Sequence, residues 1–466
     1  MTQTTTSRFV LEQFVAEELG NSAYLVADPE TGDAAVIDPL RDAGQYVERA
    51  LRRGCTIRWA LDTHVHNDFL SGGPELARAG HGRHAVPADG GLDPDAVQLR
   101  DGDVLPLGRL RLRAWHTPGH TPEHLSFLLE DEDGERLALF SGGALMVGTI
   151  ARPDLLGPGC TYPLVRAAFS TVRERLVTLS DELPVLPTHG GGSFCGAQSS
   201  DERTTTVGRE RERNPLLRTD SFFEFLAAHA KQGEYPAYYR EMAPRNRRGV
   251  ALLGISPGAP PRLDGAAVQR ERDQGTWLVD IRSHENFDGG FIAGSVNVGL
   301  SGPFSAWVGW TIPLDDPMVL ITSSSEDAWT AQRQLARIGM DAVRGWLPIE
   351  DWDEAAEPLR TIRRGSVEDL AARMEHGEPL VVLDVRQERE WAAGHLPGAV
   401  HALPPDVGGV AAGVPADQPI AIHCASGYRS AVAISLLARE GVPNLWHITD
   451  GVDRWASLGL PLTTPN

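Results

Sequence analysis

A single cysteine lies where the chain could form a nucleophile. In "PIAIHCASGYRSAVAISLLAREG", Cys424 follows an apolar, strand-like stretch and precedes a segment with helical spacing. Backbone N–H groups at a helix N-terminus and the helix dipole stabilise a thiolate, and Arg429, five residues later, adds positive charge. The loop therefore predicts a reactive thiolate. The competing interpretation, a buried and inert thiol, is common for isolated cysteines.

Histidines gather in three further stretches. His64 and His66 lie two residues apart in "DTHVHND", and His189 lies in "LPTHG". The third stretch, "HTPGHTPEH", has His120 at its centre. Imidazoles that converge from separate loops bind Fe and Zn alike. The three stretches together therefore predict a metal site.

The remaining histidines give no such pattern. Two flank His120 and are interpreted as supporting or surface groups: His116 and His124. Four others have no convergent partner in the sequence and are expected in solvent: His81, His84, His229 and His284.

The elements that must position these residues can be read from the hydrophobic pattern. "AYLVADPETGDAAVIDP" predicts a hairpin with its turn at Thr31 to Asp33, and "DAGQYVERALRRG" predicts a helix. "IRWALDTHVH" predicts a buried strand that ends where the histidines begin. The histidines are thus expected on a loop at a strand's carboxyl end, where functional residues commonly lie. "GISPGAPP" (254–261) is the expected linker.

The second half of the chain repeats itself. Residues 278–298 and 382–402 align, with Asp280 over Asp384 and Arg282 over Arg386. Farther on, each repeat has a strand, a tight loop and a helix, as repeated α/β units require. The loops differ, because the first repeat has Thr322 and Asp327 where the second has the cysteine and the arginine.

Length and charge limit the number of domains and the classes of partner that the chain can have. The 466 residues suggest about three domains. A formal charge of −20 repels nucleic acid and anionic membranes, so neither is an expected partner and the substrate should be small. No apolar run is long enough for a membrane span, and the N-terminus lacks the apolar core of a signal peptide. With Cys 4 and no CxxC pair, reduced thiols and a cytoplasmic location are expected.

The cysteine loop resembles the active-site loop of rhodanese sulfurtransferases. "CASGYR" matches their six-residue ring around a cysteine persulfide, whereas cysteine phosphatases of related fold have one residue more. "LDVR" and "GHLPGAV" are similar to further rhodanese signatures, and the resemblance covers residues 359–466. It implies that Cys424 and Arg429 are catalytic. The substrate-binding residues that it implies are Asp384, Arg386, Ser426 and Gly427. Residues 259–358 resemble the inactive halves of tandem rhodaneses, which implies a packing or docking domain.

Residues 1–245 resemble the metallo-β-lactamase superfamily. "THVHND", "TPGHTPEH" and "PTHG" occur in the order of that superfamily, and the fusion to two rhodanese-like modules resembles rhodanese-fused persulfide dioxygenases. Those enzymes use one Fe(II), O₂ and a thiol persulfide to make sulfite. The expected fold is therefore multidomain, α/β and α+β: an αββα sandwich followed by two rhodanese-like α/β domains.

Two positions depart from the family pattern. Phe69 replaces a histidine of a second metal site, which argues against a dinuclear hydrolase. Gly143 stands in "FSGG" where the family carries a ligand aspartate. The resemblance then implies a metal held by four groups at most: His64, His66, His120 and, if its loop shifts, Asp68. His189 is expected to hydrogen-bond the substrate.

We expect Fe(II) as the cofactor, with Zn(II) as the alternative. The predicted function is oxidation of a small thiol persulfide, such as glutathione persulfide, with sulfur transfer through Cys424 that involves sulfite or thiosulfate. One alternative is a metal-dependent thioester hydrolase of the glyoxalase II type. Another is a sulfurtransferase with a degenerate, metal-free N-terminal domain. The pattern leaves homo-oligomerisation open.

Overall fold

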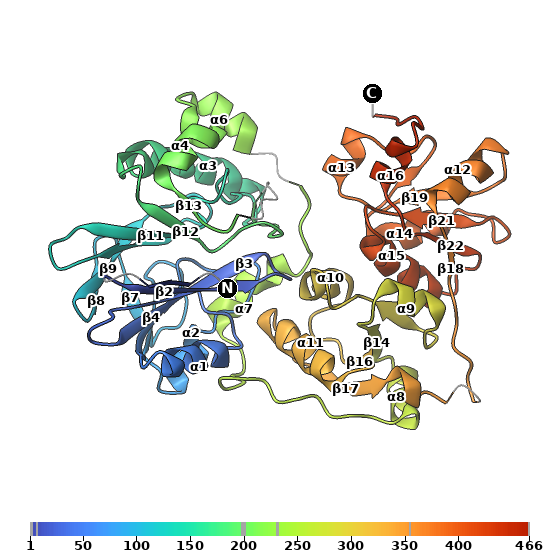
Figure 1. Ribbon diagram of the computed structural model, residues 1–466, viewed down its shortest axis with the longest axis horizontal. Coiled ribbons are helices and arrows are strands. Elements are labelled where there is room, and N and C mark those ends of the chain that lie inside the picture. Colours follow the sequence, from blue (N-terminus) through green and yellow to red (C-terminus); the bar gives the residue numbers. More distant parts are fainter. Residues whose placement is uncertain (1–2, 6–7, 197–201, 230–232, 354–355, 465–466) are drawn as a thin grey trace. The chain divides into compact units, whose positions relative to one another are not determined.

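The structure is a computed structural model that describes residues 3–5, 8–196, 202–229, 233–353 and 356–464. The chain divides into two compact units, which Figure 1 colours from blue to green and from yellow to red. The first comprises residues 1–257 with 336–339, and the second comprises residues 258–335 with 340–466. The division after Pro257 falls within the Gly/Pro stretch expected as the linker. The finer boundaries 1–245, 259–358 and 359–466 stay predictions.

The first unit is a sandwich of two sheets. Strands of the first sheet lie side by side in chain order: β1 (Gln3–Thr5), β2 (Val10–Ala16), β3 (Asn21–Ala27), β4 (Asp33–Ile37), β5 (Thr56–Leu61), β6 (Arg83–Pro87) and β7 (Val97–Leu99). The second sheet runs β13 (Thr205–Thr206), β12 (Pro184–Pro187), β11 (Arg136–Gly142), β10 (Leu125–Glu130), β9 (Leu110–His116) and β8 (Val104–Leu107). Side chains such as Tyr24 and Phe140 form one buried cluster between the sheets.

Helices cover both outer faces of this sandwich. Tyr46 of α1 (Gly44–Arg52) and Leu76 of α2 (Gly73–Arg78) pack on the first sheet. Four helices contribute to the cluster on the second sheet: α3 (Pro158–Glu174), α4 (Val207–Arg213), α5 (Pro215–Arg218) and α6 (Phe222–His229). Helix α7 (Tyr239–Arg248) follows. The expected αββα sandwich is confirmed, as is the hairpin, in which Ala27 of β3 pairs antiparallel with Ala34 of β4.

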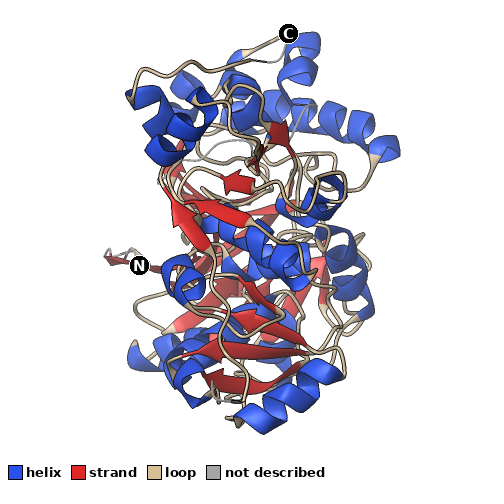
Figure 2. Cartoon of the chain, turned by 90° about the vertical axis from the view of Figure 1, so that its right-hand side faces the viewer, coloured by secondary structure: helices blue, strands red, loops and turns tan. Residues whose placement is uncertain are grey.

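The second unit contains two parallel sheets of similar order. One runs β15 (Ser295–Asn297), β14 (Trp277–Asp280), β16 (Met318–Thr322) and β17 (Val343–Pro348). The other runs β18 (Arg363–Gly365), β22 (Leu445–Ile448), β21 (Ile420–His423), β19 (Val381–Asp384) and β20 (Val400–His401). Figure 2 shows these strands in red among blue helices. The shared strand order corresponds to the repeat in the sequence. We call the part with the first of these sheets the first module and the part with the other sheet the second module.

Successive side chains that point to opposite faces explain how helices pack on both sides of the second module's sheet. Leu383 and Ile422 face α14 (Val407–Ala411) and α15 (Tyr428–Arg439), while Val382 and Ala421 contact the cluster of α12 (Val367–Glu375) and α16 (Val452–Ser457). This is the side-chain period of a strand buried on both sides. The remaining helices are α8 (Gly265–Asp273), α9 (His284–Gly289), α10 (Phe304–Thr311), α11 (Ser325–Arg337) and α13 (Glu388–Ala393).

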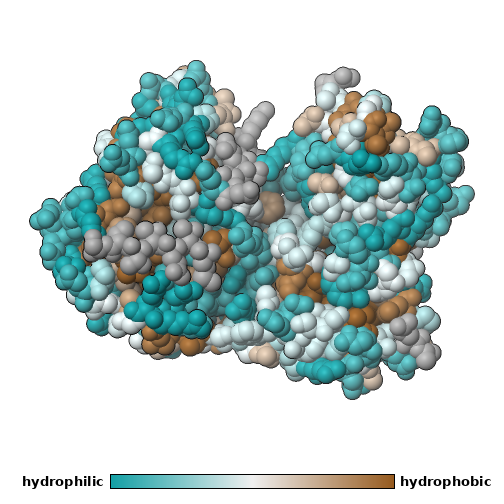
Figure 3. All heavy atoms as spheres, viewed as in Figure 1, coloured by the Kyte–Doolittle hydropathy of each residue, from teal (hydrophilic) through white to brown (hydrophobic). Residues whose placement is uncertain are grey.

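The surface accords with the high charge. Hydrophilic residues cover much of the face shown in Figure 3, and hydrophobic residues show there in separate brown patches. Among the described residues, no helix has the length and apolar character needed to cross a bilayer.

Candidate functional site

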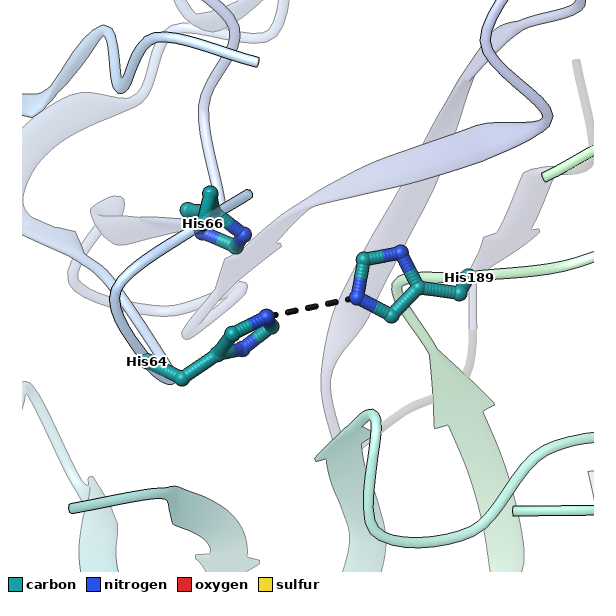
Figure 4. A group of neighbouring side chains, drawn as sticks. All are labelled: His64, His66 and His189. Atoms are coloured by element: carbon teal, nitrogen blue, oxygen red, sulfur yellow. Dashed lines mark hydrogen bonds between the residues drawn. The ribbon is translucent and has the colours of Figure 1, made fainter. Parts of the chain in front are cut away.

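Four buried histidines meet at the carboxyl ends of strands in the first unit. His64 and His66 follow β5, His120 lies between β9 and β10, and His189 follows β12. His64, His66 and His189 each offer a ligand atom within 4.8 Å of the others, and His120 forms a second such group with His189 and Cys195. In Figure 4 the rings of His64 and His189 point toward one another, with His66 beside them. The separate loops therefore do converge.

Hydrogen bonds fix the outer nitrogens of His64 and His66. The Thr63 hydroxyl donates to Asp38, so it receives the N–H of His64 Nδ1 at 2.8 Å. His66 Nε2 lies 3.1 Å from Asp38 Oδ1 and donates to it. His66 Nδ1 is buried and has no hydrogen-bond partner among the described residues. Each ring is thus tied down at one nitrogen and turns the other inward.

His120 and His189 are held in the same way. His120 Nδ1 donates to the Arg152 carbonyl at 2.7 Å, and its Nε2 is buried without a partner in the part of the chain that is described. His189 Nδ1 faces Asn21 Oδ1 at 3.1 Å and Asp68 Oδ2 at 3.2 Å, both acceptors. Metal-binding histidines are oriented by such outer acceptors. The donor set therefore fits a metal ion.

Burial sets the protonation of this centre. Desolvation lowers the pKa of His64 well below its usual value and that of His120 to about 3, so both rings are neutral, the form that binds metals. The pKa of His66 is raised, because the charge and hydrogen bond of Asp38 outweigh its desolvation. A carboxylate thus supports His66 directly, and Asp68 lies against His189 in a similar way.

Asp38 is a central residue that the motifs do not reveal. It follows β4 with a left-handed φ of 50° and binds the backbone and hydroxyl of Thr63, the ring of His66 and the hydroxyl of Thr188. Desolvation would raise its pKa, yet His66 and these hydrogen bonds lower it. The one signal in the sequence is an acidic residue directly after a buried strand.

Asp68 lies beside His189 and not in the groups of candidate ligands. Asn21 Nδ2 donates to Asp68 Oδ2 at 2.7 Å, while Asp68 Oδ1 is buried without a partner among the described residues. Its role as a ligand stays a prediction, as does the set of His64, His66 and His120. His189, which we expected at the substrate, belongs to both ligand groups.

Phe69 and Gly143, the two residues that depart from the family pattern, are closely packed against their neighbours. Phe69 is fully buried and stacks on His66 with ring centroids 4.1 Å apart, so an apolar ring fills the place of a second-site ligand. At Gly143 an added Cβ would lie 2.8 Å from His120 Cδ2 and 2.9 Å from Ala151 Cβ. The Gly143 N–H donates to His124 Nε2 at 2.9 Å. A carboxylate at 143 requires its neighbours to move.

The cysteine loop has the form expected of it. Cys424 directly follows β21, and α15 begins four residues later, after Gly427, which has a left-handed φ of 87°. Cys424 is 1% exposed. Arg429 donates to Glu390 at 2.9 Å. Burial lowers the pKa of Arg429, but its hydrogen bond to Glu390 and the charge of Cys424 outweigh this and raise it. The cation is therefore permanent.

The comparisons with known proteins fit this arrangement. The model of the Rhodanese-like domain matches residues 265–345 and 366–458. Human mitochondrial persulfide dioxygenase ETHE1 is 32% identical over 209 residues, which cover 44% of this chain and 73% of the relative. The chain belongs to the persulfide dioxygenase family. The expected fusion of a metallo-β-lactamase fold with two rhodanese-like modules is confirmed.

Two further relatives place the family in context. The crystal structure of a metallo-β-lactamase from Staphylococcus aureus has a TM-score of 0.67 and 30% identity, and the match covers 73% of this chain and 99% of that one. A hydroxyacylglutathione hydrolase from Rhodopseudomonas palustris is 28% identical over 258 residues, which cover 53% of this chain and 89% of the relative. The persulfide dioxygenase fold is thus shared with hydrolases.

Other residues implied by the rhodanese resemblance have structural contacts. Arg386 binds the carboxylate of Asp384 and the carbonyl of Gly394, each at 2.7 Å. The first module has the same pair, Asp280 and Arg282, although it has no cysteine. We infer that these pairs hold a turn; contact of Asp384 and Arg386 with substrate stays a prediction. Ser426 is exposed in the loop, and its contact with substrate stays a prediction too.

Three histidines expected in solvent are placed differently. His84 is buried and contacts Asp62 at 2.9 Å, and His229 is buried beside Phe225. His284 groups with Asp288 and His447. The expectation of solvation was wrong for all three, and for His84 and His284 a partner, Asp62 or His447, is distant in sequence.

Proposed function

We propose that the chain is an enzyme of sulfide metabolism with two activities on sulfane sulfur. In the first unit, a low-molecular-weight thiol persulfide such as glutathione persulfide is oxidised at a single metal ion. In the second unit, Cys424 accepts and donates sulfane sulfur. The observation that carries the proposal is a buried centre with four inward-facing ring nitrogens in the same chain as a complete cysteine loop.

The metal would be held by His64, His66 and His189, with His120 at the edge of the group. A bound ion supplies electron exchange with O₂ if it is iron, or Lewis acidity toward a thioester if it is zinc. The net oxidation is R–S–SH + O₂ + H₂O → R–SH + SO₃²⁻ + 2 H⁺, in which sulfane sulfur is oxidised and O₂ is reduced.

The surrounding residues orient the ligands and limit water. Asp38 and Thr63 hold two rings by their outer nitrogens, so the inner nitrogens need not reorganise when a ligand arrives. Phe69 covers one face of His66 with an apolar ring. This restricts the centre to one ion and shields a reactive sulfur species from solvent.

At the cysteine loop the proposed transfer is a pair of displacements. The Cys424 thiolate attacks the outer sulfur of R–S–SH, the S–S bond breaks, and R–S⁻ leaves and takes up a proton. The product, Cys424–S–SH, loses its proton and is then attacked at its outer sulfur by sulfite, which gives thiosulfate and regenerates the thiolate. The N–H groups of α15 and the guanidinium of Arg429 stabilise each sulfur anion.

The decisive experiment combines metal analysis with activity. Protein purified without air should contain about one iron per chain and take up O₂ when glutathione persulfide is added. His64→Ala should lose O₂ uptake and keep thiosulfate–cyanide sulfur transfer. Cys424→Ser should lose transfer and keep O₂ uptake. Iron-free protein without O₂ uptake would overturn the oxidative half.

A thioesterase is the second candidate. It is favoured by Gly143, because a centre of imidazoles without the family's ligand carboxylate is a typical zinc site. Zinc in the purified protein, together with hydrolysis of a glutathione thioester and no O₂ uptake, would select this function. Folded, metal-free protein that retains sulfur transfer would instead identify a plain sulfurtransferase.

A further inference from the structure

A chain of buried polar groups leads away from the reactive cysteine. Ser430 Oγ lies 3.5 Å from Cys424 Sγ and 2.8 Å from His447 Nε2. His447 Nδ1 lies 2.7 Å from Asp288 Oδ2. None of the four side chains is more than 1% exposed. Burial of an acid, an imidazole and a hydroxyl in one line is costly unless each satisfies the next.

The line crosses from one module to the other. Cys424, Ser430 and His447 belong to the second module, whereas Asp288 lies on α9 of the first module, which lacks a cysteine. Both modules belong to the same compact unit. The acidic end of the line therefore comes from a module with no nucleophile of its own.

Two further contacts join the first module to the helix that carries the loop. The Tyr428 hydroxyl donates to the Gly299 carbonyl at 2.9 Å, and the Asn297 N–H donates to Ser435 Oγ at 2.9 Å. His284 packs on the loop itself, since a Cβ on Gly427 would lie 2.8 Å from its ring. These contacts fix Asp288 relative to α15.

Donor and acceptor chemistry gives the line a direction. A carboxylate only accepts, so His447 Nδ1 carries a proton. His447 Nε2 faces Ser430 Oγ and, at 3.2 Å, the Gly427 carbonyl, which also only accepts. The Ser430 hydroxyl also lies 3.0 Å from the Gly427 carbonyl, which therefore competes with Cys424 for its proton. A thiolate at Cys424 only accepts, so the Ser430 hydroxyl can donate to the sulfur when His447 Nε2 donates to that carbonyl in its place.

Charged and aromatic groups lie against His447 and its partner Asp288. Asp288 faces its Nδ1, and the guanidinium of Arg364 lies 3.4 Å from the same carboxylate oxygen. The ring of His284 packs edge-on, with centroids 5.4 Å apart. Arg429, the cation of the cysteine loop, is paired with Glu390. The Asp288 carboxylate is the charged group nearest to the His447 ring.

We propose that Asp288 and His447 are positioning residues of the Cys424 centre, which hold the Ser430 hydroxyl as a donor to the sulfur anion, so that the module without a cysteine completes the active site. The inference rests on the sulfur-transfer half of the proposed function. A charge-assisted O–H···S⁻ bond favours the thiolate and persulfide anions over their protonated forms. Its loss is expected to slow transfer about tenfold or more.

The test uses the full chain with Asp288→Asn, His447→Gln and Ser430→Ala. Thiosulfate–cyanide transfer gives kcat and KM, and the rate of Cys424 alkylation by iodoacetamide is followed against pH by peptide mass spectrometry. Each variant should lower kcat about tenfold with little change in KM. Each should also move the alkylation profile to higher pH. Asp327→Asn, an exposed acid of the first module, is the matched control and should match the wild type in both assays.

Folding is checked by thermal unfolding and by the metal content of the first unit. Folded Asp288→Asn and His447→Gln with wild-type kcat and pH profile would overturn the inference. If Asp288→Asn fails to fold, Ser430→Ala decides in the same two assays. If the wild type itself transfers no sulfur, the sulfur-transfer half of the proposed function is wrong. In that case Cys424→Ser shows no loss of transfer relative to the wild type.

Discussion

His64 Nε2 and His189 Nε2 face each other at 3.3 Å although the outer nitrogens of both rings hold the protons. Two lone pairs at this distance repel unless a cation lies against both. Two nitrogens each about 2.1 Å from one ion at a tetrahedral angle are roughly 3.4 Å apart. The spacing therefore fits two ligands of one metal ion, which supports the proposed metal centre.

The first prediction concerns metal affinity. His189→Ala removes a ring that belongs to both ligand groups, so the affinity should fall at least tenfold, a loss on the order of 1.4 kcal/mol. Equilibrium dialysis with Zn(II) or anaerobic Fe(II) measures it. His116→Ala is the control, because His116 bonds the Pro122 carbonyl outside the groups of candidate ligands. Equal affinities of the two variants would remove His189 from the site.

The second prediction concerns the packing at Gly143. Gly143→Ala places a methyl group 2.8 Å from His120 Cδ2, so the ring must shift or the loop must move. We expect a loss of about 1–3 kcal/mol in the free energy of unfolding and weaker metal binding. Denaturant unfolding and dialysis measure both.

The control for that substitution is Gly159→Ala, where nothing lies within 4 Å of the added Cβ. Its stability and metal affinity should stay near those of the wild type. Gly143→Asp meets the same clash, so restoring the family carboxylate should be costly in this chain. Tighter iron binding by Gly143→Asp without loss of stability would contradict this packing argument.

The sequence predicts local geometry well and distant contacts poorly. The hairpin, the placement of His64 and His66 after a strand, and the loop around Cys424 all follow from patterns within about 20 residues, and the structure has each of them. Asp38, by contrast, bonds Thr188, which is 150 residues away. The order of strands in the sheets brings such residues together, and a local motif does not reveal that order.

The same limit explains the histidines that were misplaced. His284 looked isolated because its neighbour His447 lies in the other module. His189 was assigned to the substrate because Phe69 replaces a histidine of the second metal site. In both cases the contact joins two parts of the fold, either the two modules or the two sheets of the sandwich. Single motifs identify the chemistry of a site more reliably than its full set of groups.

The third prediction separates two reasons for a glycine at 427. Gly427 and Gly441 both have a left-handed φ, of 87° and 79°, but only at 427 would a Cβ meet another side chain, the ring of His284. Both alanine variants should lose about 1 kcal/mol of stability from backbone strain. Gly427→Ala alone should also lose sulfur transfer, by tenfold or more. Equal transfer rates in the two variants would show that the contact with His284 is unimportant.

The last prediction follows from the ion pair at the cysteine loop. Burial would raise the pKa of Glu390, but its hydrogen bond to Arg429 and the charge of Arg429 lower it below the ordinary 4.5. A lowered folded pKa gives stability that is fully present above the unfolded value and is lost as pH falls through the folded value. Glu390→Gln should therefore be less stable by about 0.5–1 kcal/mol at pH 7, and the difference should shrink below about pH 4.5.

Urea unfolding between pH 7 and pH 4, followed by tryptophan fluorescence, measures this difference. Glu388→Gln is the matched control, because Glu388 lies on the same helix α13 with its side chain 66% exposed. Its effect should be smaller at pH 7, since exposed pairs are screened by solvent. A Glu390→Gln difference that is constant across this range would mean that the charge of Glu390 does not stabilise the fold, and Arg429 would then be held by its packing alone.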